Sequence, residues 1–574
     1  MTKPATEDFH EDRGRAIALH KAGKIKDAAA IYSALLAAEP DNRDILGLLS
    51  VAQLALGEAE AAVANWRKCL ALEPAVPNRL RLIANFLAAL KRLARVRSLA
   101  TDYAVPDTAF LADIAIPDWP ADTPLGKESQ TVVLDLAHGL VRFDRRAAGF
   151  RLIDSALMQL SDDPEFVTGA ATVMLEAGET EKALQLLNGL PPKADRDNAA
   201  VLIVQAAAVQ AAGRREEAES LSRRARDAAP VCLSEKMPHQ RMLIGVLNEA
   251  ARIIGQPATA FALHFSANIP AALVARMNEE FRFVSIYPQA TTAQQALKAL
   301  PAPQLIINNW VNGEMLSVPG TLDFIATFAD SFGVPVINHP GNAQQTTRQL
   351  NAERLAGIKD LIVPRIIRIM NEPQKRDLVL TEIASTIGFP VIIRNPASQQ
   401  GSQTRKIDTP AELATLLAQW PHPQLYAIEY VNNEVEKGFY RKMRAVVIGG
   451  ELFMLHAHFA PQWNVHRSRE AHKLEPGLQA FASKVVSHPQ EILGEPAMAA
   501  LGEISKRIPL DIFGIDFDLT ADGRVLFFEA NASMRISLTE RDGLAETRLA
   551  MRDAYRRLFD GAATRPGVSG ARSA

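Results

Sequence analysis

A pattern of four residue types near the start of the chain recurs after 34 positions. It consists of a glycine, an alanine five residues later, an aromatic residue after nine and a proline after seventeen. Its first copy is Gly23, Ala28, Tyr32 and Pro40. Its second copy is Gly57, Ala62, Trp66 and Pro74. A small residue lets two helices approach closely, an aromatic ring fills the groove between them, and proline ends a helix. A chain with this period is expected to fold as stacked helical hairpins.

The same spacing returns later in the first half. The alanine position recurs at Ala148, Ala183 and Ala218, which lie 35 residues apart, and the glycine position recurs at Gly178 and Gly213. This pattern resembles the tetratricopeptide repeat (TPR), a family of 34-residue helical hairpins.

The repeats are predicted in two runs. We expect TPR-like repeats at residues 1–103 and 127–257, because the prolines and the glycine of residues 104–126 cannot continue a helix. Two short solenoids are therefore expected. Such an array offers an extended concave surface, so we expect a peptide or protein partner there. A purely structural role of the repeats is the alternative.

From about residue 260 the pattern changes to short apolar runs that alternate with helical segments, which is typical of an α/β fold. Nine of these runs are predicted to be strands: FRFVSIY, QLIINNW, VPVINHP, FPVIIR, LYAIEYV, MRAVVIGG, ELFMLHAHF, FGIDFDL and RVLFFEA.

The last two runs flank the dipeptide Asp522-Gly523, a strong signal for a two-residue hairpin turn. With that turn, Phe517 pairs with Phe528 and Asp516 pairs with Glu529. Side chains alternate across a strand, so one face of the hairpin is predicted to be apolar. The other face would carry Asp516, Asp518, Glu529 and Asn531.

Two carboxylates directly opposed across a strand pair repel each other. A cation between Asp516 and Glu529 would remove that repulsion, and oxygen ligands are those that Mg²⁺ prefers. The hairpin therefore predicts a magnesium site. A solvent-exposed polar face is the alternative.

Two further segments suit a nucleotide. The run FPVIIR ends in Arg394 and enters a small polar loop, residues 395–404, whose backbone N–H groups could cover phosphates. Later, an extended segment at residues 428–431 precedes the basic residues Arg441, Lys442 and Arg444. An extended backbone can bind adenine, and a basic cluster can balance the charge of a transferring phosphoryl group.

In this order the three elements resemble the ATP-grasp superfamily, which includes glutathione synthetase, the ribosomal-protein glutamate ligase and D-alanine:D-alanine ligase. The resemblance spans roughly residues 260–550. It implies a Rossmann-like domain at 258–340 and an α+β ATP-grasp domain at 341–560. Residues 561–574 are expected to be a disordered tail. The predicted fold is thus multidomain, with an all-α solenoid followed by α/β and α+β parts.

The resemblance also implies site residues. The magnesium ligands of the family correspond to Asp516, Glu529 and Asn531. The phosphate-binding basic residue corresponds to Arg394, and the glycine-rich lid to Ser398, Gly401 and Ser402.

The adenine hinge of the family corresponds to Glu429, Tyr430 and Val431, with Glu434 or Glu436 near the ribose. The basic residue that precedes the next strand corresponds to Arg444. Alternation places Arg441 on the opposite face, where it is a possible substrate contact.

The resemblance implies an ATP- and Mg²⁺-dependent ligase that activates a carboxylate as an acyl phosphate for attack by an amine or another nucleophile. The expected substrate is a peptide or protein recruited by the repeats, with an amino acid or small molecule as co-substrate. Direct phosphotransfer and a non-catalytic scaffold are the alternatives.

A formal charge of −2 gives no reason to expect a nucleic-acid or membrane partner. With no signal sequence or long apolar run, a cytoplasmic protein is expected.

Overall fold

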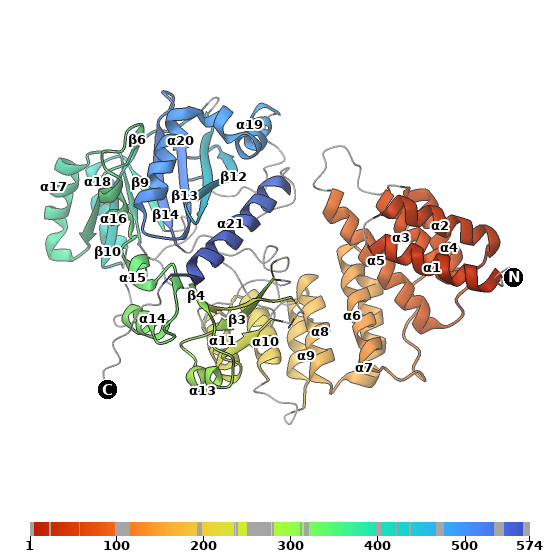
Figure 1. The fold of residues 1–574 in the computed structure, drawn as a ribbon. Helices are drawn as coiled ribbons and strands as arrows, with labels where there is room; N and C mark the ends of the chain where they lie inside the picture. Colours follow the sequence, from red (N-terminus) through yellow and green to blue (C-terminus); the bar gives the residue numbers. More distant parts are fainter. Residues whose placement is uncertain are drawn as a thin grey trace. The chain divides into compact units, whose positions relative to one another are not determined.

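The computed structural model describes residues 5–21, 24–56, 58–97, 115–191, 198–234, 236, 239–248, 277, 280–309, 313–314, 321–396, 403–420, 422–435, 438–465, 476–532 and 545–565. These residues fall into two compact units, with the change from the first to the second at Ala228/Ala229 (Figure 1). The predicted order, in which a helical repeat array precedes α/β and α+β parts, is confirmed.

The described residues of the first unit form helices and no strands, and these helices are arranged as consecutive hairpins. They are α1 (Ala5–Lys21), α2 (Ile25–Ala38), α3 (Arg43–Leu56), α4 (Ala59–Ala71), α5 (Val76–Arg97), α6 (Lys127–Arg142), α7 (Arg146–Leu160), α8 (Pro164–Glu176), α9 (Thr180–Asn188), α10 (Ala199–Ala211) and α11 (Arg215–Ala228).

The repeated residues form the cores of these hairpins. Ala28 and Tyr32 on α2 are fully buried, as is Ala62 on α4, and the ring of Trp66 stacks on Phe86 of α5 with 4.2 Å between ring centroids. The three later alanines of the pattern are also buried. Gly23 and Gly57 lie outside the described residues. The repeat pattern therefore marks helix–helix contacts.

The two runs of repeats form one compact unit, so the prediction of two separate solenoids is wrong. Helix α5 packs on α6, where Gly139 leaves room for the side chain of Leu87. Described residues of the predicted interruption also pack on the second run. Trp119 is buried, and its backbone N–H donates to the hydroxyl of Ser155 on α7 at 3.0 Å. The described residues 115–126 form no helix, yet the first run packs on the second through α5 and α6.

The second unit begins with a five-stranded sheet of order β1-β3-β2-β4-β5. Its strands are β1 (Val231–Leu233), β2 (Met242–Leu247), β3 (Phe281–Ile286), β4 (Leu305–Asn308) and β5 (Val336–Ile337). All neighbours are parallel except β1 and β3. Two of the described helices, α13 (Ala293–Lys298) and α14 (Thr321–Asp330), lie between these strands in the sequence. This is the Rossmann-like sheet that the sequence predicts.

The predicted boundary between residues 257 and 258 is wrong, because β1 and β2 belong to the Rossmann-like sheet. Strand β2 lies at its centre, between β3 and β4. The repeat pattern gives no signal of this change, because the strands are short and follow directly on the last repeat. The Rossmann-like part therefore begins near Ala229.

Two further sheets follow, one antiparallel and one with a single parallel strand pair, and each is covered by helices on its apolar face. The smaller sheet, called sheet C here, has the order β7-β10-β8-β9, with β7 (Ile366–Met370), β8 (Val391–Arg394), β9 (Thr404–Ile407) and β10 (Gln424–Glu429). Helices α17 (Arg376–Thr386) and α18 (Pro410–Gln419), with the short 3₁₀ helix η3 (Pro373–Lys375), accompany it, and α17 and α18 share its apolar core. All of these residues lie within the predicted ATP-grasp domain.

The larger sheet, called sheet B here, has the order β12-β11-β13-β14-β6. Its strands are β6 (Leu361–Ile362), β11 (Tyr440–Ile448), β12 (Glu451–Ala460), β13 (Ile512–Leu519) and β14 (Val525–Asn531). Helices α19 (Pro476–Ser487) and α20 (Pro489–Arg507) pack on its apolar face. Two helices, α15 (Pro340–Gln344) and α16 (Arg348–Leu355), lead into these sheets. All nine strands predicted from the sequence are present.

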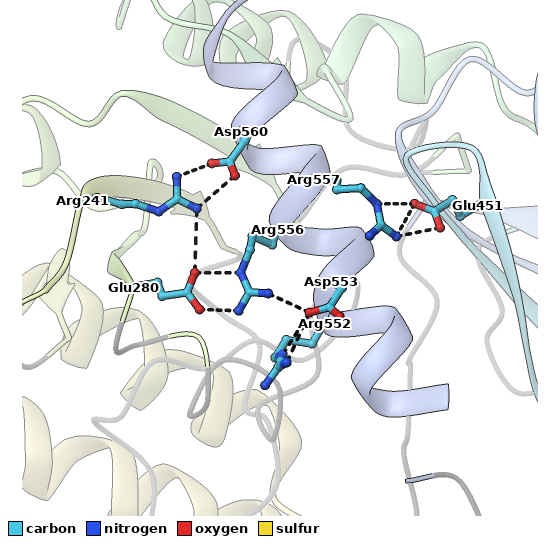
Figure 2. A network of polar contacts seen from close by, with 8 residues as sticks. All are labelled: Arg241, Glu280, Glu451, Arg552, Asp553, Arg556, Arg557 and Asp560. Carbon is cyan, nitrogen blue, oxygen red and sulfur yellow. Dashed lines mark hydrogen bonds and ion pairs between the residues drawn. The ribbon is translucent and has the colours of Figure 1, made fainter. Parts of the chain in front are cut away.

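Helix α21 (Ala545–Ala563) connects the Rossmann-like sheet to sheet B. Tyr555 and Phe559 are buried in one cluster with residues of both sheets. Figure 2 shows the ion pairs around this helix: Asp560 with Arg241, Arg556 with Glu280, and Arg557 with Glu451. The helix continues through residue 563, so the prediction of a disordered tail from residue 561 is wrong at its start.

No helix among the described residues is long and apolar enough to span a membrane.

Candidate functional site

The hairpin of β13 and β14 places the predicted carboxylates opposite each other. Asp516 pairs with Glu529, as the sequence predicts, but Phe517 pairs with Phe527 instead of Phe528. A bulge lies between these two pairs, with Phe528 as the additional residue.

The loop of this hairpin also differs from the prediction. Two hydrogen bonds, from Gly523 N to Thr520 O and from Thr520 N to Arg524 O, both 2.9 Å, close a three-residue loop. The bulge compensates for the additional loop residue, so the register at Asp516 is the predicted one.

Four side chains of sheet B form one cross-strand row. Glu529 on β14 pairs with Asp516 on β13, Asp516 with Arg444 on β11, and Arg444 with His456 on β12. This row lies on the face opposite to the apolar core, because the flanking Ile515 and Ala530 are part of that core. Directly opposed residues are neighbours, so the row is a continuous polar strip across four strands.

Asp516 is almost fully buried and is ion-paired on both oxygens. Its carboxylate accepts from Arg444 Nε at 2.6 Å and Nη2 at 2.8 Å, and Lys442 Nζ lies at 3.5 Å. Burial alone would raise the pKa of Asp516, but the charges of Arg444 and Lys442 outweigh it and hold this pKa well below its usual range. Asp516 is therefore a fixed negative charge.

Lys442, which the sequence reading did not select, reaches the site, and Arg441 does not. Arg441 pairs with the buried carboxylate of Asp518, and its guanidinium lies over the ring of Phe481 on α19. Asp518 lies beyond the bulge, opposite Leu526, so it is not part of the row. Burial raises the pKa of Asp518, against the opposing charge of Arg441. Alternation along β11 explains why Lys442 and Arg444 share a face.

Two histidines extend the basic end of the row. The rings of His456 and His458 on β12 are stacked, with centroids 4.0 Å apart. Burial, followed by the neighbouring charges of His458 and Arg444, holds the pKa of His456 well below its usual value. His456 is therefore neutral at pH 7.

Arg348, at the start of α16, is a site residue that the sequence reading missed. Its buried guanidinium forms an ion pair with Glu529 and lies 3.6 Å from Glu314. The backbone N–H of Arg348 donates to Glu314 Oε1 at 2.7 Å. The segment that contains Arg348 carries no recognisable motif, so only the folded chain identifies it.

Sheet C contributes Arg394, the predicted phosphate contact, from the end of β8. Arg394 pairs across the sheet with the buried Tyr426 of β10, whose hydroxyl accepts from Arg368 of β7 at 2.7 Å and donates to Glu314 at 3.0 Å. Burial, together with the nearby charge of Arg348, lowers the pKa of Arg394. Asp516 also acts electrostatically on Arg394. The polar faces of sheets B and C therefore meet at one cluster.

The predicted adenine hinge begins at Glu429, the last residue of β10. Glu429 forms an ion pair with Arg365 at 3.1 Å, which lowers the pKa of Glu429. Lys406 Nζ lies over the ring of Tyr430, 4.6 Å from its centroid, and the ring of Trp463 meets that of Tyr430 edge-on, with 6.2 Å between centroids. The hinge is thus held by side chains of separate elements. Val431 and Glu434 follow in the same described segment.

Four predicted residues lie outside the described part of the chain: the lid residues Ser398, Gly401 and Ser402, and Glu436. Their assignments remain predictions. Besides Arg348, the sequence reading also missed Glu314, Arg368 and Tyr426.

The three predicted magnesium ligands fit a hard cation in their chemistry. Two opposed carboxylates and the amide of Asn531, two residues after Glu529 on the same strand, supply oxygen donors. Among the described residues no group of three His, Cys, Asp or Glu side chains could hold a metal. The proposed set contains two carboxylates and one amide, so it is not a group of that kind. In this structure Arg444 and Arg348 neutralise the carboxylates.

Residues 19–65 match a family model described as tetratricopeptide repeat. No curated protein sequence matches the chain. The similar solved structures include ATP-grasp ligases.

One similar structure is D-alanyl-alanine synthetase A from Vibrio cholerae, at 11% identity over 57% of this chain and 99% of that chain, with a TM-score of 0.37. A second is ATP-grasp ligase PsnB complexed with minimal precursor, Mg and ADP, at 15% identity over 55% and 98%, with a TM-score of 0.32. A third is N5-carboxyaminoimidazole synthetase from Staphylococcus aureus complexed with ADP, at 12% identity over 53% and 72%, with a TM-score of 0.32.

Proposed function

We propose that the second unit binds Mg²⁺-ATP where the polar faces of sheets B and C meet, and that it activates a carboxylate for ligation to an amine. One observation carries this proposal. Four cationic side chains from three separate segments, Arg348, Arg394, Lys442 and Arg444, gather around the opposed carboxylates of Asp516 and Glu529.

Four positive side chains so close together favour the binding of a polyphosphate, which carries several negative charges. The charge of Arg348 adds to burial in lowering the pKa of Arg394, and a bound anion would relieve that repulsion. Guanidinium groups bind phosphate oxygens through two parallel N–H donors, which fixes the orientation of the phosphate. Arg394 and Arg348 are therefore assigned to the phosphates, and the Glu429–Val431 segment to adenine.

Asp516, Glu529 and Asn531 would hold magnesium, which would neutralise charge on the transferring phosphoryl group when bound. The residues of this chain then have three tasks. Arg444 and Lys442 orient the phosphoryl group and balance its charge, and the sheets exclude water from the acyl phosphate. No side-chain nucleophile is needed for this chemistry, because the substrate carboxylate attacks the phosphorus and ADP leaves.

The substrate is assigned to the class of peptides or proteins, because a TPR array offers a concave surface suited to an extended segment. The repeats would raise the effective concentration of that partner near the site. An amino acid or another small molecule would supply the second reactant.

The proposal is tested by two substitutions of Arg394. Arg394→Ala should weaken Mg²⁺-ATP binding by on the order of a hundredfold, and Arg394→Lys by about tenfold, because lysine keeps the charge and loses the two-pronged geometry. Displacement of a fluorescent ATP analogue measures both affinities. The control is Arg405→Ala, whose partner Ile393 is in the apolar core, so Arg405 lies on the opposite face of sheet C.

Equal effects of the two Arg394 substitutions would argue against a phosphate contact. The reaction type is tested separately with hydroxylamine during ATP turnover with candidate peptides. A hydroxamate indicates an acyl phosphate, whereas a stable phosphorylated product indicates a phosphotransferase.

A further inference from the structure

Glu314 joins three segments of the second unit at the proposed phosphate site. Its Oε1 accepts from the backbone N–H of Arg348 at 2.7 Å and lies 3.6 Å from Arg348 Nη1. Its Oε2 accepts from the hydroxyl of Tyr426 at 3.0 Å. Only 14% of the Glu314 side chain is exposed, and 8% of that of Arg348. Both carboxylate oxygens of Glu314 are therefore engaged in a nearly dry environment.

The backbone fixes Glu314 at this place. Gly313 lies so close to the start of α16 that an added Cβ would be 2.4 Å from the carbonyl carbon of Thr346 and 2.5 Å from the nitrogen of Thr347. Only glycine permits that approach. Thr347 caps α16 by accepting from Leu350 N, so Glu314 contacts the first turn of a capped helix. A carboxylate there also gains from the helix dipole.

Glu314 contacts an arginine that is close to both a negative and a positive side chain, Glu529 and Arg394. The guanidinium of Arg348 is paired with Glu529 of sheet B and is close enough to Arg394 of sheet C to lower the pKa of that residue. A buried arginine near a second arginine needs a fixed partner to keep one orientation. Glu314 supplies that partner without belonging to either sheet.

The position of Glu314 in the chain also links Arg348 to the Rossmann-like sheet. Residues 313–314 follow β4, at the carboxyl end of a parallel strand. In open parallel sheets, small molecules bind in the crevice outside the carboxyl ends of the strands. A ligand bound there would therefore lie near Glu314, which contacts Arg348.

We propose that Glu314 is a positioning residue, which holds Arg348 for a polyphosphate and couples the Rossmann-like sheet to the nucleotide site. The proposal rests on the proposed function, since it requires that Arg348 contact phosphate. Tyr426 supports it by orienting the second carboxylate oxygen, and Arg368 in turn donates to the Tyr426 hydroxyl.

The test compares binding of Mg²⁺-ATP and of adenosine in Glu314→Gln. Positioning predicts that the Kd for Mg²⁺-ATP rises about tenfold, while the Kd for adenosine is unchanged. If Glu314 acted only as a negative charge, the Kd for Mg²⁺-ATP would fall in Glu314→Gln, because removing that charge would strengthen the attraction for phosphate. An affinity for Mg²⁺-ATP that is unchanged or tighter in Glu314→Gln overturns the proposal.

Two further variants keep the test independent of folding. Tyr426→Phe removes one hydroxyl and should weaken Mg²⁺-ATP binding in the same direction by a few-fold, again without effect on adenosine. Glu372→Gln, in an exposed i,i+3 pair with Lys375, is the matched control and should bind both like the wild type. If the wild type itself does not bind Mg²⁺-ATP, the proposed function fails. If it binds and Glu314→Gln binds equally well, only this inference fails.

Discussion

At the scale of single residues, the carboxylate of Asp516 has two tasks, as a proposed magnesium ligand and as the partner of buried cations. Its own exposure is 2%, and Arg444 and Lys442 depend on it for neutralisation. Removal of one member of a buried ion pair leaves the other charge uncompensated, which costs far more than loss of an exposed pair.

Asp516→Ala should therefore lower the free energy of unfolding of the second unit by about 3–5 kcal/mol, beyond any loss of activity. Urea unfolding followed by circular dichroism measures this. The control is Asp522→Ala in the exposed loop of the same hairpin, which should change that free energy by less than about 0.5 kcal/mol. Equal stability of Asp516→Ala and the wild type would contradict the role of this ion pair.

The pH dependence of this contribution follows from the pKa shift. The folded-state pKa of Asp516 lies below that of an unfolded aspartate, which is about 3.9. The unfolded chain therefore binds the proton first, so Asp516 stabilises the fold above that pH and loses its effect as the pH falls further. The stabilities of the wild type and Asp516→Ala should converge on acidification.

At the scale of elements, the aromatic position of the repeat controls the stability of the first unit. Trp66 on α4 is 2% exposed and stacks on Phe86 of α5 at an interplanar angle of 12°. Loss of a buried tryptophan leaves a cavity between two helical hairpins.

Trp66→Ala should destabilise the first unit by about 3–5 kcal/mol, measured as a shift of its unfolding transition in urea. Mg²⁺-ATP affinity should be unchanged, because every described residue of the proposed site belongs to the second unit. Loss of nucleotide binding in this variant would show that the repeats are needed for the site.

At the scale of the whole molecule, the boundary between the units decides where the chain can be divided. A chain that begins at Ala229 keeps the complete Rossmann-like sheet. A chain that begins at residue 258 lacks β2, whose Ile244, Val246 and Leu247 are fully buried at the centre of that sheet.

The chain beginning at Ala229 should be soluble and bind Mg²⁺-ATP with the affinity of the full chain. The chain beginning at residue 258 should aggregate, because a sheet without its central strand exposes its core and two unpaired edges. Soluble expression and analogue binding test both. Normal binding by the shorter chain would mean that β1 and β2 are dispensable.

The sequence by itself determined those features that depend on local pattern. The 34-residue spacing indicated the helical hairpins because the same contact recurs in each repeat. Alternation and turn signals predicted nine strands and the opposition of Asp516 and Glu529. The pairing of Asp516 with Glu529 was correct even though the loop and the bulge were not, since each adds one residue and the two changes cancel.

Only the tertiary structure decided which distant residues meet. Arg348, Glu314 and Tyr426 lie in segments without a motif, and they come together because sheet C, sheet B and residues 313–314 converge. Likewise, Lys442 rather than Arg441 faces Asp516 because of the register of β11. A linear sequence shows periodicity within an element, whereas contacts between elements depend on packing of the whole chain, which no local pattern contains.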